Sequence, residues 1–215
     1  MCIRDSLYPV QLLNWSWNGG KPPLPIYNPQ LSHVIYLGYQ SGLGFTMRQM
    51  STGEILWGSQ VSDPGNKPVW SRDGQQVYII KQKDPGRNEE VFSIDKNGKE
   101  SQLTYLSSIY PQTGISGIYP SRDGNSIAFW LYTKDDKVEK YKHLAILDLT
   151  TKAVTEYCYN KGGGPIFWSP NGNQLAFDIS NYSGGDLRTI VVDLSNNIAV
   201  KVSNNETPIG WLVNP

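Results

Sequence analysis

The sequence predicts an all-β fold, a β-propeller whose blades are sheets of four antiparallel strands. A phrase made of an apolar strand, a polar turn and a second apolar strand recurs along the chain, with its turns at Leu31, Gly74, Gly124 and Gly172. The spacings between these turns, 43, 50 and 48 residues, match the length of one blade. Gly (21 residues), Pro (14) and aromatic residues (12%) are abundant, and no segment has the period of a helix. Many short strands joined by turns are typical of all-β domains.

The hairpin turn has a sequence that explains its shape. In residues 166–178 the strand IFW leads into Ser-Pro-Asn-Gly and then into LAF. Asn and Gly tolerate the left-handed backbone that a tight hairpin needs. The same turn is predicted in the two preceding copies, and its structural residues are Asp73, Gly74, Asp123, Gly124, Asn171 and Gly172. In the first copy Leu31 replaces the Gly, which predicts a looser hairpin there.

Two further strands follow each hairpin. The third strand is apolar and usually ends in Asp, as in residues 91–95, 144–148 and 189–193, with 45–49 as a divergent copy. After a short turn the fourth strand includes residues 55–57, 102–105, 154–157 and 199–202. A meander of four strands buries both of its faces only against neighbouring units, so the units are expected to stack around an axis.

The chain divides into repeated units with incomplete ends. Residues 1–6, MCIRDS, resemble the translation of a sequencing-library adapter and are set aside as an artefact. Residues 7–24 are expected to end a preceding blade and connect it to the next. Blades are predicted at about 25–62, 63–110, 111–160 and 161–205, and 206–215 begins another, because Trp211 repeats Trp168. The expectation is a fragment of a ring of about six to eight blades. A closed four-bladed ring is the alternative.

Composition excludes several classes of partner. The 19 basic and 19 acidic residues balance, which argues against binding to nucleic acid or to an anionic membrane surface. No apolar run is long enough to span a bilayer. With Cys2 in the adapter segment, Cys158 is the one remaining cysteine, so neither a disulfide nor a thiolate metal cluster is expected.

The residues present offer no catalytic constellation. A serine hydrolase needs a nucleophile on a strained turn and a His to take its proton, but no G-x-S-x-G occurs. The two histidines, His33 and His143, are expected at a hairpin or strand edge. The glycines at 162–164 precede Pro165 and a strand, whereas a phosphate-binding loop needs a Lys and a helix. Residues 95–98 lack the closing Glu of a calcium loop. We therefore predict no catalytic residue, no metal and no cofactor.

The phrases WSRDG, PSRDG and WSPNG, each followed by a strand ending in Asp, resemble the TolB-type, WD-repeat-like β-propeller repeat. The resemblance covers roughly residues 25–215. Similar blades form the N-terminal propellers of dipeptidyl peptidase IV and prolyl oligopeptidase relatives. It implies a bacterial protein of the periplasm, the cell envelope or the secreted fraction. It also implies that the Ser, Asp and Gly of the turns are structural, and it transfers no catalytic residue.

Binding is expected on the loops of such a scaffold. The variable loops are predicted at 81–90, 106–117, 132–141 and 178–186. Their aromatic and cationic side chains have the composition of binding hot spots. The candidate binding residues are Arg87, Tyr110, Tyr132, Tyr141 and Tyr182. Ordinary solvated loops remain the alternative interpretation.

These observations lead to a non-catalytic, TolB-like scaffold that binds a protein, peptide or glycan partner, besides the remaining blades of its own chain. The alternative is the N-terminal propeller of a prolyl oligopeptidase or dipeptidyl peptidase IV-type serine hydrolase whose catalytic domain lies outside these residues. A propeller lyase or glycosidase is a third hypothesis. Asp135, Asp136 and Glu139 are too close together for the opposed acid and base that it requires.

Overall fold

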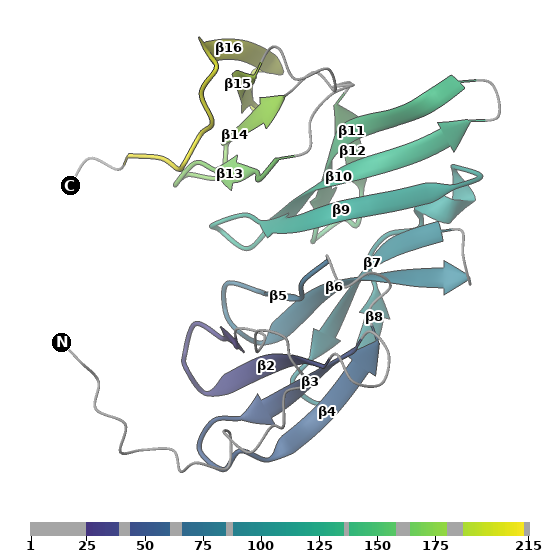
Figure 1. Ribbon diagram of the computed structural model, residues 1–215, viewed down its shortest axis with the longest axis vertical. Coiled ribbons are helices and arrows are strands. Elements are labelled where there is room, and N and C mark those ends of the chain that lie inside the picture. The colour runs from purple at the N-terminus through teal and green to yellow at the C-terminus, as the bar shows by residue number, and fades with distance from the viewer. Residues whose placement is uncertain are drawn as a thin grey trace, which may run out of the picture.

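A computed structural model describes residues 25–38, 44–60, 66–84, 88–135, 138–157, 164–179 and 187–212. Within these ranges the chain forms sixteen strands and one short 3-10 helix. Figure 1 shows the sheets stacked in chain order along the long axis, from the N-terminal sheet at the bottom to the C-terminal sheet at the top. The prediction of an all-β propeller architecture is confirmed. The predicted segments 1–6 and 7–24 lie outside the described residues.

The strands group into four successive meanders, which we call blades 1 to 4. Blade 1 contains β1 (Ile26–Tyr27), β2 (His33–Gly38), β3 (Gly44–Gln49) and β4 (Ile55–Gln60). Blade 2 contains β5 (Val69–Trp70), β6 (Gln76–Asp84), β7 (Asn88–Asp95) and β8 (Glu100–Gln102), followed by the 3-10 helix η2 (Leu106–Ser108). Blade 3 contains β9 (Thr113–Pro120), β10 (Ser126–Asp135), β11 (Val138–Asp148) and β12 (Val154–Tyr157). Blade 4 contains β13 (Phe167–Trp168), β14 (Gln174–Ile179), β15 (Arg188–Asp193) and β16 (Ile198–Asn204).

Neighbouring strands within each blade pair in antiparallel fashion and in sequence order. Blades 2 and 3 are also joined into one continuous sheet, because β7 and β9 pair in parallel at Asn88 and Thr113. This pairing starts β9 earlier than expected, so the predicted loop at 106–117 was wrong in its second half. The loop predicted at 132–141 is also shorter, because β10 and β11 remain paired as far as Asp135 and Val138.

The hairpin turns have the predicted backbone. Gly74, Gly124 and Gly172 have φ angles of 64°, 79° and 74°. In each of these turns the Ser hydroxyl oxygen accepts a hydrogen bond of 2.9 Å from the N–H five residues later. The looser first hairpin was a wrong prediction, because Leu31 adopts the same left-handed conformation (φ 54°). Asn28 replaces the Ser there, and its Oδ1 accepts from the N–H of His33 at 2.9 Å.

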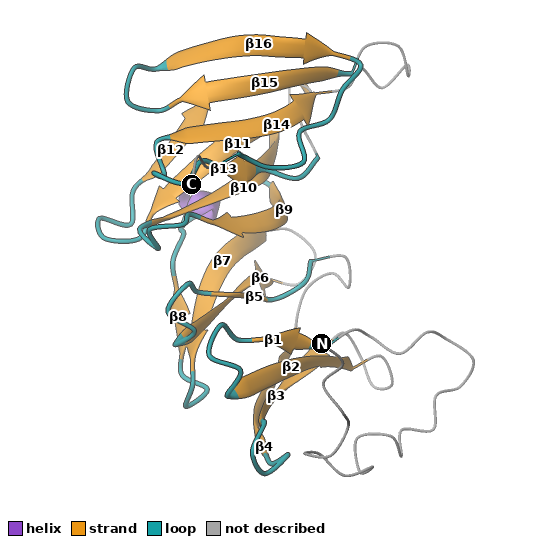
Figure 2. Cartoon of the chain, turned by 90° about the vertical axis from the view of Figure 1, so that its left-hand side faces the viewer, coloured by secondary structure: helices purple, strands orange, loops and turns teal. Residues whose placement is uncertain are grey.

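The core lies between the blades. Three apolar clusters fill the junctions, which we call 1/2, 2/3 and 3/4 after the blades on either side. Because successive residues of a strand point to opposite faces, each middle blade contributes to two clusters. In β6, for example, Ile79 packs in junction 1/2, whereas Tyr78 and Ile80 pack in junction 2/3. Figure 2 shows the sheets from the side, following one another from blade 1 at the bottom to blade 4 at the top. Among the described residues no helix is long and apolar enough to cross a membrane.

Candidate functional site

The innermost strands are linked from blade to blade by tryptophan side chains. The indole N–H of Trp70 donates to the carbonyl of Ile26 at 3.0 Å. Trp168 donates to Tyr119 at 2.7 Å, and Trp211 donates to Phe167 at 3.0 Å. Each acceptor carbonyl belongs to the first strand of the preceding blade. These bonds were not predicted, although the Trp that precedes Ser in the WS phrase marks the position.

Junction 2/3 departs from this pattern. The residue equivalent to the tryptophan is Pro120, which has no donor to offer. The second strand of the preceding blade also contributes one residue at each junction. This residue is Ile35 at junction 1/2 and Ala128 at junction 3/4. At junction 2/3 it is Tyr78, which is 5% exposed. The large ring therefore comes from the preceding blade at this junction and from the following blade at the other two.

The inner strands of blades 3 and 4 form an aromatic depression of about 450 Å³, which we call the inner-strand depression. Its lining residues are Val69, Ile118, Tyr119, Pro120, Arg122, Ile166, Phe167, Trp168, Pro170, Gly210 and Trp211. The four aromatic side chains among them are only partly buried. Because the two indole N–H groups already have carbonyl acceptors, the rings offer apolar surface to a ligand, and Arg122 offers the one charge of the lining.

Tyr110, a predicted binding residue, makes its contacts with other residues of the blades. Its hydroxyl donates to the carboxylate of Glu156, and its ring packs against the cluster of junction 2/3. Burial, together with the hydrogen bond and the charge of Glu156, raises the pKa of Tyr110 to about 12. The phenol thus stays protonated and serves as a donor at neutral pH.

Tyr132 lies on the other side of blade 3. Its ring packs against the cluster of junction 3/4, and Nζ of Lys142 lies 4.8 Å from its centroid and 5.3 Å from that of Trp130. Since Tyr110 packs in junction 2/3, the two tyrosine rings lie against different clusters, and the structure does not bring them together. Strand side chains alternate between faces, and the predicted loops are partly strand. Arg87 and Tyr182 lie outside the described residues, as does the side chain of Tyr141.

The predicted turn residues make the same hydrogen bond, from Ser to Asp or Asn, in three successive blades. Oδ1 of Asp73 accepts from the Ser71 hydroxyl at 2.6 Å and from the N–H of Gln75 at 3.1 Å. The Ser71 bond is the main reason that the pKa of Asp73 is lower than usual. Burial alone would raise the pKa of Asp123, but hydrogen bonds from Ser121 and Asn125 lower it overall.

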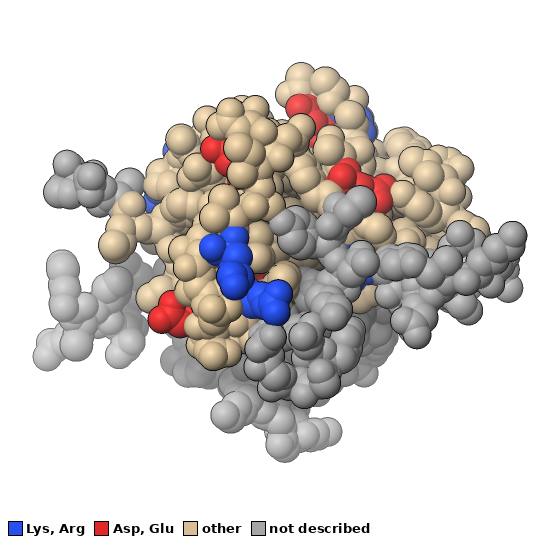
Figure 3. Space-filling view, turned by 90° about the horizontal axis from the view of Figure 1, so that it is seen from above, with Lys and Arg blue, Asp and Glu red and all other residues tan. Residues whose placement is uncertain are grey.

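Charged side chains do not form one large patch on the described part of the face at the blade 4 end. Figure 3, a view onto the end formed by blade 4, shows basic and acidic side chains as small separate groups among uncharged residues on the described part of that face. No group of three or more His, Cys, Asp or Glu suited to a metal ion occurs among the described residues. Chemically, the inner-strand depression is a surface for apolar and aromatic contacts.

Comparisons with known proteins give the fold. No family model matches the chain, and no curated protein matches it. Among solved structures it resembles a putative TolB from Agrobacterium tumefaciens, with a TM-score of 0.59 and 15% identity over 86% of this chain and 67% of that one. It also resembles puromycin hydrolase, with a TM-score of 0.59 and 13% identity over 85% of this chain.

The chain spans 29% of the length of puromycin hydrolase. It spans 55% of the TolB from Acinetobacter baumannii, which is 16% identical over 86% of this chain at a TM-score of 0.42. At such identities the similarity bears on architecture alone. The resemblance predicted from the WSRDG-type turns is confirmed at that level, and the chain has the fold of a TolB-like β-propeller.

Proposed function

We propose that this chain is part of a non-catalytic, TolB-like propeller that binds an extended peptide segment of a partner protein in the inner-strand depression. The observation that carries the proposal is the concave group of Tyr119, Phe167, Trp168 and Trp211 beside Arg122. Aromatic residues and Arg dominate the energetics of protein interfaces. A peptide also suits the site better than a small apolar molecule, because the depression is open and its lining comes from several strands and turns.

The scaffold around the depression is rigid. The indole bonds fix two of the rings, and the Arg122 carbonyl accepts from a guanidinium N–H of Arg72 in blade 2. A preformed site loses little conformational entropy when the ligand binds. Arg122 favours a peptide that carries a carboxylate next to apolar or aromatic residues. In keeping with the TolB likeness, we propose a location in the periplasm, the cell envelope or the secreted fraction.

Selection of a phage-displayed random peptide library on the purified protein tests the proposal. We expect enriched sequences that combine aromatic or Pro residues with an acidic residue. The corresponding synthetic peptide should lose about tenfold or more in affinity on Phe167→Ala, since burial of an aromatic ring contributes on the order of 2 kcal/mol. Arg122→Gln should weaken the binding of the acidic peptide selectively.

Phe167 is suited to this test because it lines the depression without belonging to any of the three core clusters. Tyr105→Ala is the matched control, because Tyr105 is 59% exposed and does not line the depression. Peptides that bind the Phe167→Ala protein as tightly as the unchanged protein would place the binding surface elsewhere and contradict the proposal.

A second candidate function rests on the likeness to puromycin hydrolase. On this alternative the chain belongs to the propeller of a serine hydrolase of the prolyl oligopeptidase type, and the propeller selects substrates for a separate catalytic domain. Sequencing the reading frame beyond residue 215 separates the two. A downstream G-x-S-x-G followed by Asp and His would favour the hydrolase, and further blades followed by a stop codon would favour the scaffold.

A further inference from the structure

A second cavity, distinct from the inner-strand depression, lies at junction 2/3 on the side of the hairpin turns. We call it the rim cavity. It has a volume of about 530 Å³, within the range of about 300–1,000 Å³ that is usual for small-molecule sites. Its lining residues are Ser71, Arg72, Asp73, Gln76, Tyr78, Asp123, Gly124, Leu149 and Lys152. They come from the β5–β6 turn and β6 of blade 2, and from the β9–β10 and β11–β12 turns of blade 3.

Tyr78 is the one aromatic residue on the wall of this cavity. The residue is 5% exposed, and none of the described hydrogen bonds involves its hydroxyl. Burial, with a smaller contribution from the charge of Asp73, raises the pKa of Tyr78 to about 12, so the hydroxyl keeps its proton at neutral pH. A ligand in the rim cavity would supply a hydrogen-bond partner for this hydroxyl.

The charged groups around the cavity balance one another. Arg72 and Lys152 provide two cations, and Asp73 and Asp123 provide two carboxylates. A ligand with a net charge would meet a group of like sign as well as one of opposite sign. A neutral ligand that both donates and accepts hydrogen bonds would satisfy all four groups.

Several of these groups are already held in place. Asp73 and Asp123 are fixed as acceptors by the hydroxyls of Ser71 and Ser121. Arg72 is anchored by its hydrogen bond to the carbonyl of Arg122 across the junction. Carboxylates have further acceptor positions, and a guanidinium has further donors, so each can also bind a ligand. Preorganised donors and acceptors lower the entropy lost on binding.

We infer that the rim cavity binds a neutral saccharide, whose hydroxyls donate to Asp73 and Asp123 and accept from Arg72, Lys152 and the Tyr78 hydroxyl. Sugar hydroxyls suit this lining because each one is both a donor and an acceptor. This inference is independent of the proposed peptide site, since the two cavities share no lining residue.

Saturation-transfer NMR on the purified protein tests the inference. The probes are sucrose, trehalose and cellobiose as neutral saccharides, glycine as a zwitterion and sodium phosphate as an anion. At least one disaccharide should give a saturable signal, whereas glycine and phosphate should give none. Tyr78→Phe removes one hydroxyl and keeps the ring in the core. It should weaken saccharide binding about three- to tenfold, the value of one hydrogen bond.

Lys152→Gln provides a second variant that does not touch the core, because Lys152 is exposed, and it should weaken the same disaccharide. Tyr105→Phe is the matched control and should leave binding unchanged. The inference is overturned if none of the three disaccharides binds, if glycine or phosphate binds in their place, or if both site variants bind the disaccharide as well as the unchanged protein does.

Discussion

Junction 2/3 differs from junctions 1/2 and 3/4 in how the inner strands are joined. At the two outer junctions a Trp of the following blade fills the space and donates an indole hydrogen bond to the preceding blade. At junction 2/3 Pro120 occupies that position and Tyr78 of the preceding blade supplies the ring. The propeller repeat therefore tolerates an exchange of the large residue between the two sides of a junction, provided that the volume between the blades is filled.

A buried carboxylate lies beside junction 2/3, where the chain leaves blade 2. Glu90 is fully buried, and its carboxylate accepts from the Thr104 hydroxyl at 2.6 Å and from the N–H groups of Leu106 and Ser107 at 2.9 and 2.8 Å. These bonds fix η2, the segment that leads from blade 2 into blade 3. A buried carboxylate network thus stands at the junction that has no indole bond.

Replacing the buried carboxylate should have the largest effect. Glu90→Ala leaves two backbone N–H groups and a hydroxyl without their acceptor, so we expect the free energy of unfolding to fall by about 3 kcal/mol. Urea denaturation followed by tryptophan fluorescence measures this change. Glu90→Gln keeps the shape and one acceptor oxygen and should cost less. A loss below about 0.5 kcal/mol for the Ala variant would mean that the network does not hold the junction.

Two substitutions can give junction 2/3 the large residue on the same side as at junction 1/2. Pro120→Trp alone overfills junction 2/3 and should cost about 2 kcal/mol. Tyr78→Ile alone leaves a void and should cost a similar amount. The double variant reproduces the Trp and Ile of junction 1/2. Its loss in free energy of unfolding should therefore be smaller than the sum of the two single losses by about 1–2 kcal/mol. Strictly additive losses in a double-mutant cycle would refute the exchange.

The turns offer a comparison that depends on pH. Asp73 and Asp123 have lowered pKa values, whereas blade 4 has Asn171, whose Oδ1 accepts from Ser169 at 2.7 Å in the same way. A carboxylate with a lowered folded pKa contributes stability above its unfolded pKa of about 3.9, and that stability is lost as the pH falls through the folded value.

As the pH is lowered from roughly 5 to 2, the melting temperature of the double variant Asp73→Asn, Asp123→Asn should therefore fall less than that of the unchanged protein. Melts followed by circular dichroism across this range measure the difference. Asn171→Asp, which adds a titrating group to the blade 4 turn, should steepen the loss. Identical pH profiles for all three proteins would show that the turn carboxylates contribute nothing to acid sensitivity.

The fold was predictable because its determinants are local. The Gly turns and the alternating strands of each repeat can be read without knowing what lies beside them. The candidate site was not, because it depends on pairs such as Tyr119 and Trp168 that lie far apart in sequence and meet only across a junction. Leu31 shows the same limit on a smaller scale, since Asn28 and the strands on either side hold it in a conformation that Leu rarely adopts.

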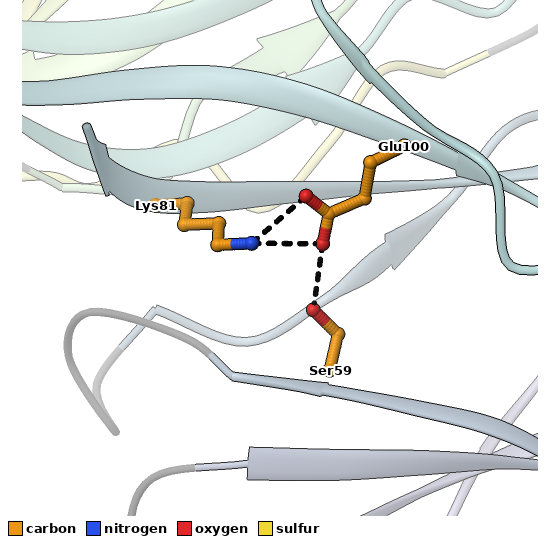
Figure 4. Close-up of polar contacts among 3 residues, drawn as sticks. All are labelled: Ser59, Lys81 and Glu100. Atoms are coloured by element: carbon orange, nitrogen blue, oxygen red, sulfur yellow. Dashed lines mark hydrogen bonds and ion pairs between the residues drawn. The ribbon is translucent and has the colours of Figure 1, made fainter.

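The outer edge of junction 1/2 should show the smallest effect. Figure 4 shows Lys81 of β6 bonded to Glu100 of β8 at 2.8 Å, with the Ser59 hydroxyl of β4 donating to the same carboxylate at 3.0 Å. Both charged side chains are 33% exposed, so solvent and salt screen the pair. Glu100→Gln should therefore cost about 0.5 kcal/mol in urea denaturation, and less at high salt. A loss as large as that of Glu90→Ala would mean that the blades are held together at their outer edge and not along the inner strands and the buried core.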